Sequence, residues 1–192
     1  MSRPAAPLLA TFSFAALLTA CAVPPNAPVD TARLPNAAPW YLGDVDTWAI
    51  NHAEWAFADP ARTLNRPAEA ARAVAALDYI AGQMNTSYRW ANSIGPIAKM
   101  ELLTARADMR AALGIAPNAP SQAVVNAMLA AADALIVGNP HAAMAAMTGP
   151  AFLRPPQEML ASLGNLPYIR SANLATARAN TDLNEDGRGG RR

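Results

Sequence analysis

The sequence predicts an all-α protein, a compact bundle of five to seven helices that follows a signal peptide and a proline-rich tether. Alanine, the strongest helix former, makes up about a quarter of the 192 residues. After residue 40, apolar residues recur at spacings of three and four, and the alternation typical of strands is absent. Prolines and glycines interrupt these stretches at intervals that suit short helices joined by tight turns.

The first three expected helices lie between residues 44 and 114. The first begins at Asp44, a suitable N-cap residue, and ends at Asp59-Pro60. The second opens at Pro67, because proline is favoured in a first turn. A third segment starts at Thr86 or Ser87, is broken or kinked at Gly95-Pro96, and continues to Gly114.

Four further segments complete the expected bundle. A helix from Pro120 to Gly138 is apolar on two flanks, which favours a central, well-buried position. Short helices follow from Asn139-Pro140 and from Pro155-Pro156, and a last helix covers about residues 167–179. Residues 180–192 are polar and rich in glycine, so we expect them to be disordered.

Composition limits the classes of function. Hydrophobic residues make up 53% of the chain and charged residues 15%, and the formal net charge is +1. No basic stripe is present, so we expect no nucleic-acid partner. The expected organisation is a signal peptide (1–20), a tether (21–39), a helical domain (40–179) and a polar tail (180–192). If fully extended, the tether would reach about 50 Å.

The first 21 residues have the three parts of an export signal. Arg3 provides a positive start, and an apolar run of about 11 residues from Leu8 to Leu18 is too short to span a bilayer. The segment Leu18-Thr19-Ala20-Cys21 follows directly. Cys21 is the only cysteine, so it cannot form an intramolecular disulfide.

This four-residue segment resembles the lipobox of bacterial lipoproteins, with an aliphatic residue three before the cysteine and a small residue directly before it. The resemblance covers only the first 21 residues. It implies cleavage between Ala20 and Cys21 and attachment of lipid to Cys21, since two or more acyl chains anchor a protein stably. The alternative is an ordinary cleaved signal with a chance cysteine. Ala22, where an inner-membrane lipoprotein often has aspartate, favours the periplasmic face of the outer membrane.

Trp48, His52 and Trp55 are the first candidate site, because helical spacing places them on one face. An aromatic groove with one histidine could bind a flat or glycan-like ligand. The alternative is that these rings form the core of the first helices, since aromatics supply much of the burial in an alanine-rich domain.

Other candidate residues carry weaker patterns. His141, Met144 and Met147 recur every three residues and offer soft ligands for copper(I), although methionine in a helix more often fills the core. Asp182, Asn184, Asp186 and Gly187 match the start of a calcium loop, but its twelfth position lies beyond the chain end. The pattern of Arg106, Asp108 and Arg110 is typical of a solvated helix face.

No catalytic motif is recognisable, so the sequence predicts a non-enzymatic, membrane-anchored envelope lipoprotein that requires no cofactor. Its helical domain is expected to bind an envelope protein or to support an assembly. The alternative is a lipoprotein that binds a small ligand or metal through the aromatic residues or the His/Met segment. An unrecognised enzyme is the third possibility.

Overall fold

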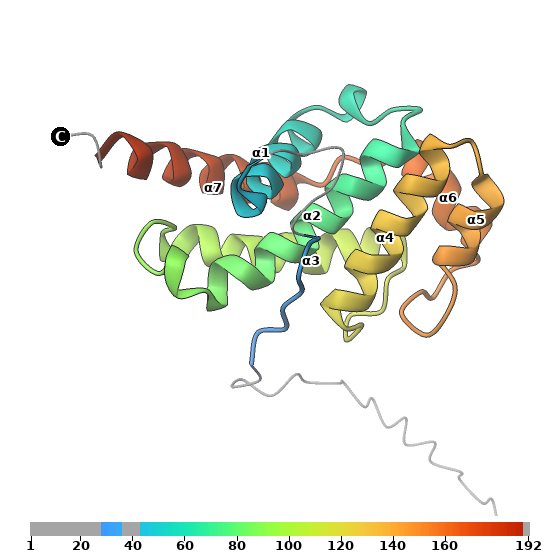
Figure 1. Cartoon of the computed structure of the whole chain (residues 1–192), viewed down its shortest axis with the longest axis horizontal. Helices are drawn as coiled ribbons and strands as arrows, with labels where there is room; N and C mark the ends of the chain where they lie inside the picture. The colour runs from blue at the N-terminus through green and yellow to red at the C-terminus, as the bar shows by residue number, and fades with distance from the viewer. Residues whose placement is uncertain (1–27, 36–42, 190–192) are drawn as a thin grey trace, which may run out of the picture.

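The computed structural model describes residues 28–35 and 43–189, and side chains up to residue 185. Within these ranges it contains seven helices and so confirms the all-α class (Figure 1). These are α1 (Val45–Ala58), α2 (Pro67–Thr86), α3 (Pro96–Leu113), α4 (Ser121–Ile136), α5 (Pro140–Ala146), α6 (Pro156–Gly164) and α7 (Arg170–Gly189). Two short 3-10 helices, η1 (Pro60–Arg62) and η2 (Tyr88–Trp90), lie in the connections before and after α2. No helix in the described ranges is long and apolar enough to cross a bilayer.

Several helix ends lie where the turn chemistry predicts them. The Asp44 side chain accepts a hydrogen bond from the backbone N–H of Thr47 and so caps α1. Asn139 caps α5 in the same way through the N–H of Ala142. Gly114 ends α3 with a φ of 72°, a left-handed conformation that glycine adopts without the strain of a side chain.

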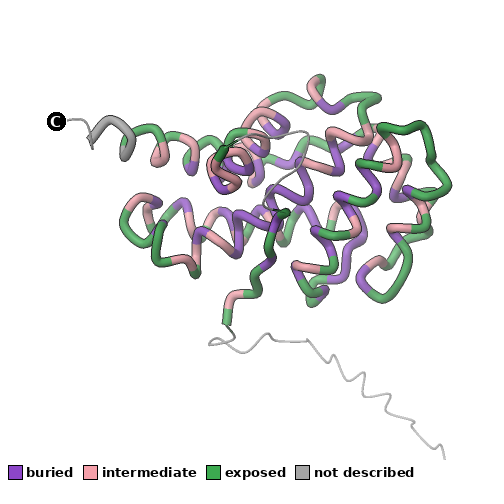
Figure 2. Tube along the Cα trace, viewed as in Figure 1, coloured by how far each residue is buried: buried purple, intermediate pink, exposed green. Residues whose placement is uncertain are grey.

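Helix α2 is the centre of the bundle. It contacts α1, α3, α4 and α6, while α7 packs on α1 and α3, and α5 packs on α4 and α6 (Figure 1). Figure 2 shows that burial is concentrated along α2 and on the helix faces turned toward it. Many of its buried residues are alanines, and small side chains allow neighbouring helices to approach closely.

The expectation that the helix from Pro120 to Gly138 is central and well buried is confirmed for its burial, while the central position belongs to α2. Helix α4 packs against both α2 and α5, and its exposed strip contains Asn126 and Ala130, while Ile136 near its end is 55% exposed. Both apolar flanks are buried over most of their length: Val124, Met128 and Ala131 lie on one, and Val125, Leu129 and Ala132 on the other.

An ion pair in the interior contradicts the assignment of Arg106, Asp108 and Arg110 to one solvated face. Arg110 is 4% exposed and pairs with the fully buried Asp78 of α2. Arg106 is half-buried, and only Asp108 is exposed. Charge alone gave no indication of burial, because the partner Asp78 is 32 residues away in the sequence.

Residues 28–35, the N-terminal segment, pack against the helical body although they fall within the expected tether. Ala32 and Leu34 are each 5% exposed and belong to the hydrophobic core. The segment lies beside α2 and α4 and emerges on the side of the body where α4 begins (Figure 1). The expected signal peptide (1–20) and, within the expected tether, Cys21 with residues 22–27 and residues 36–39 lie outside the described residues.

Helix α7 continues to Gly189, which contradicts the expectation of a disordered tail from residue 180. The Asp182 side chain accepts a hydrogen bond of 2.8 Å from the backbone N–H of Gly95, and Leu183 packs against the core. These contacts fix a stretch whose composition alone suggested disorder. Because residues 182–187 are helical, they do not form the loop that calcium coordination would need.

Candidate functional site

The structure brings Trp48, His52 and Trp55 together as a stacked row on α1, in which both tryptophans pack against the hydrophobic core. The ring centroids of Trp48 and His52 are 5.0 Å apart with planes 13° from parallel. Those of His52 and Trp55 are 5.7 Å apart at 28°. All three residues are half-buried, whereas Ile50 and Phe57 on the opposite side of α1 enter the core. The row is neither the core of the domain nor fully exposed.

His52 is held in an environment that favours its neutral form. Burial lowers the pKa of its imidazole, and the nearby charge of Arg72 lowers it further, while the carboxylate of Glu69 opposes this. The His52 Nε2 atom is buried and makes no hydrogen bond within the described part of the chain. It lies 3.9 Å from an Oε2 atom of Glu69, close enough for an ion pair if the ring gains a proton.

A surface depression of about 420 Å³ lies beside this row. The residues that line it are Asp44, Thr47, Trp48, Asn51 and His52. They combine two aromatic rings with an amide, a hydroxyl and a carboxylate. This combination suits a ligand with an apolar face and hydroxyl groups at its rim.

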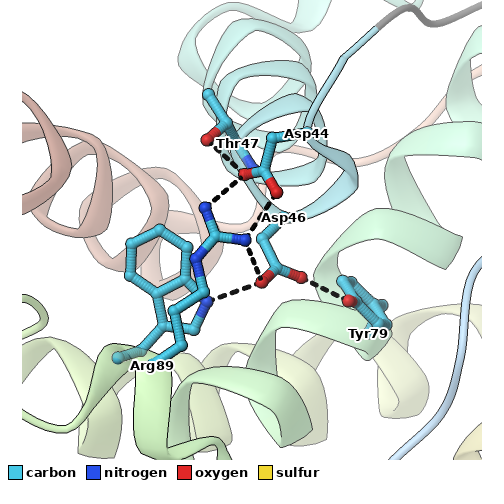
Figure 3. A network of polar contacts seen from close by, with 6 residues as sticks. Asp44, Asp46, Thr47, Tyr79 and Arg89 are labelled. Atoms are coloured by element: carbon cyan, nitrogen blue, oxygen red, sulfur yellow. Dashed lines mark hydrogen bonds and ion pairs between the residues drawn. The ribbon is translucent and has the colours of Figure 1, made fainter.

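Sequence reasoning did not find the polar network beneath the start of α1 (Figure 3). The buried Asp46 carboxylate accepts hydrogen bonds from the hydroxyl of Tyr79 and from the Trp90 Nε1 atom, the latter at 2.7 Å. Arg89 Nη1 adds a contact of 3.3 Å to the same carboxylate. Burial, and then the hydrogen bond to Asp46, raise the pKa of Tyr79. Asp46 is thus fully engaged with its neighbours.

Asp44 joins this network from the surface. Two nitrogens of Arg89 donate to its carboxylate oxygens at 2.5 and 3.0 Å, and the Thr47 hydroxyl donates at 2.6 Å. Partial burial would raise the pKa of Asp44, but the hydrogen bonds from Arg89 and Thr47 outweigh it and lower the pKa to about 2. The Arg89 guanidinium also lies 4.4 Å from the Trp90 ring centroid, a cation–π contact.

The His/Met segment does not converge. Met147 is fully buried in the core, Met144 is half-buried, and His141 is exposed. Each step of three residues turns the side chain away from a common helix face, which accounts for this separation. Among the residues that the structure describes, no group of three or more His, Cys, Asp and Glu side chains is placed to hold a metal ion.

A groove of about 610 Å³ lies along α4, opposite the connection that follows α5. Most of its lining is alanine and proline, with Phe152 at one side and Asn118, Asn126 and Thr148 as the polar members. It contains no ionisable side chain and is separate from the aromatic row on α1.

Comparison with known proteins does not assign this chain to a family. No family model, curated protein or solved structure matches the chain. Any function must therefore be inferred from its own residues. The depression beside α1 and the groove along α4 are surfaces on which a ligand could bind. The charged side chains Asp44, Asp46 and Arg89 are instead engaged in hydrogen bonds with one another or with neighbouring side chains.

Proposed function

We propose that the chain is a lipid-anchored lipoprotein of the bacterial envelope, whose helical domain binds another protein or supports an envelope assembly without catalysis. The observation that carries the proposal is Leu18-Thr19-Ala20-Cys21, placed directly after an apolar core of signal-peptide length. The anchor is Cys21, and Ala22 favours the periplasmic face of the outer membrane.

The interior of the domain supports a binding or structural role. Asp46, Asp78 and Arg110 are buried, yet each makes several hydrogen bonds that consume its donors or acceptors. Groups occupied in this way fix the relative positions of helices. A catalytic acid or base would instead need an open path to a substrate.

Metabolic labelling with palmitate tests the anchor. The wild-type chain should incorporate label and fractionate with the outer membrane, whereas Cys21→Ala should do neither. Ser13→Ala, a change within the apolar run, is the matched control and should behave as wild type. If Cys21→Ala remains membrane-bound and the wild type takes up no label, the lipoprotein proposal is wrong.

Affinity capture tests the binding role. The lipidated protein should retain one stoichiometric envelope protein after gentle solubilisation, and Cys21→Ala should retain less of it. A wild-type protein that elutes as an unaccompanied monomer would contradict the binding role.

A small-ligand function is the second candidate, favoured by the depression beside Trp48 and His52. The matched variants are Asn51→Ala, which changes this depression, and Asn118→Ala, which changes the groove along α4. Soluble glycan fragments should alter tryptophan fluorescence in the wild type and Asn118→Ala, with weaker affinity in Asn51→Ala. Equal affinity in all three proteins would remove the depression as the site.

A further inference from the structure

The N-terminal segment is built into the body by a close backbone contact at Gly82 of α2. A Cβ atom added at Gly82 would lie 2.6 Å from the Asp30 carbonyl oxygen and 2.9 Å from the Thr31 Cα atom. Glycine in the interior of a helix is unfavourable relative to alanine. Its use at this position is explained by the segment that crosses there.

Hydrogen bonds at both edges hold the segment in place. An Asp30 carboxylate oxygen accepts from the Ser121 N–H at 2.5 Å, which supplies the side-chain cap that Pro120 cannot give to α4. Arg106 donates to the Asp30 carbonyl at 2.9 Å. The Gln122 amide makes two hydrogen bonds with the Arg33 backbone, at 2.8 and 3.0 Å.

We infer that docking of this segment limits the distance between the membrane and the helical domain. It also keeps the N-terminal side of α4 toward the lipid. The inference rests on the proposed lipid attachment at Cys21. Pro28, where the docked part begins, is seven positions after Cys21, so the link can reach about 25 Å at most. Without docking, the free chain would extend to the start of α1 near Asp44 and could reach about 80 Å.

The consequence is a face of the domain that is held close to the lipid headgroups. This face includes the loop before α4 and the first turn of α4. The aromatic row belongs to α1 and lies near Glu69 and Arg72 in the first turns of α2, whereas the N-terminal segment crosses α2 at Gly82.

Two pairs of variants separate docking from folding. Gly82→Ala places a methyl group against the Asp30 carbonyl, while Gly164→Ala adds the same group where nothing lies within 4 Å. Leu34→Asp puts a charge in a buried position of the segment, while Thr31→Asp puts it in an exposed one.

Each of the four variants is made in the full lipidated chain, which also carries Ala123→Cys as a labelling site. The Cys21 thiol is consumed by lipid, so a donor dye can label Cys at 123 alone.

The measurements are hydrogen exchange at the Arg33 amide and energy transfer from the dye to acceptor lipids in vesicles of phosphatidylethanolamine and phosphatidylglycerol. Gly82→Ala and Leu34→Asp should lose protection at Arg33 and show less energy transfer, because the maximum reach rises about threefold. Gly164→Ala and Thr31→Asp should match the parent protein in both measurements. Circular dichroism should show an intact helical body in all four.

Three results would overturn the inference. An Arg33 amide that exchanges as fast as free chain in the parent protein would mean that the segment does not dock. Lost protection with unchanged energy transfer would mean that docking does not limit the distance to the membrane. Absence of lipid on Cys21, measured by mass, would instead remove the proposed anchor while leaving the exchange result intact.

Discussion

Arg110 and Asp78 form a two-point ion pair inside the bundle, in which Arg110 Nε and Nη2 each donate to a different Asp78 oxygen at 2.8 Å. The remaining guanidinium contacts include the carbonyl of Ala119 and the hydroxyl of Ser121. One side chain of α3 thereby connects α2, the loop before α4 and the first residue of α4.

Replacing Arg110 with methionine should destabilise the protein by about 3–5 kcal/mol, because Asp78 would be left buried without a partner. Chemical denaturation monitored by circular dichroism measures this. Arg178→Met is the matched control, since Arg178 pairs with Glu101 at the surface and its loss should cost at most about 1 kcal/mol. Equal losses in the two variants would refute a structural role for the buried pair.

Tyr79→Phe should cost about 1–3 kcal/mol, because it removes a donor to the buried Asp46 carboxylate and leaves an acceptor unsatisfied. Tyr88→Phe is the control, since Tyr88 is 94% exposed and its hydroxyl remains solvated. The two variants are compared by denaturant midpoint. A Tyr79→Phe protein as stable as Tyr88→Phe would show that the Asp46 network contributes little.

Stability should fall as the pH drops below about 6.5 because of His52. Burial lowers the pKa of this imidazole from 6.5 in the folded protein. Between the folded-state pKa and 6.5, the unfolded chain binds more protons, so the free energy of unfolding decreases as the pH falls. Glu69 and Arg72 are the charged groups that influence the ring.

His52→Phe keeps a ring in the row but cannot gain a proton, so its stability should vary less between pH 7 and 5. His141→Asn, which changes an exposed histidine, should keep the wild-type dependence. Thermal unfolding across this pH range makes the comparison. A steep loss of stability retained in His52→Phe would assign the effect to another group.

Asp44 should stabilise the folded state in its charged form. Its pKa is lowered from 3.8 to about 2, so its contribution is present above pH 4 and is lost as the pH falls through 2. Asp44→Asn preserves N-capping, since asparagine caps as well as aspartate, but removes the charge. The stability difference between wild type and Asp44→Asn should therefore shrink from pH 5 to pH 2. A constant difference would argue against the pair with Arg89.

Local sequence signals predicted the helices well because their ends depend on nearby residues. Asp44, Gly114 and Asn139 terminate or cap helices through backbone geometry that extends over only a few positions. The stacked row on α1 was predictable for the same reason, since Trp48, His52 and Trp55 follow helical spacing. Its half-buried position depends on how α1 packs, which spacing does not specify.

The features that the sequence did not predict depend on partners far along the chain. Asp78 and Arg110 are 32 residues apart, and Asp182 contacts the Gly95 backbone across 87. Proline-rich composition suggested an extended N-terminal segment, which is its local conformation. It did not indicate that Ala32 and Leu34 are buried in the core, or that the backbone of Asp30 and Thr31 packs closely on Gly82.

The cap that Asp30 provides to Ser121 has a consequence for the order of events during biogenesis. The two residues are 91 positions apart, and a ribosome makes the N-terminal partner first. Until the beginning of α4 has been synthesised, residues 28–35 can meet Gly82 and Arg106 but lack the hydrogen bonds with Ser121 and Gln122 that complete their docking. If Cys21 carries the proposed lipid, an attachment made before that point would take place on a chain whose segment is not yet fully docked, and docking would follow as a late step of maturation.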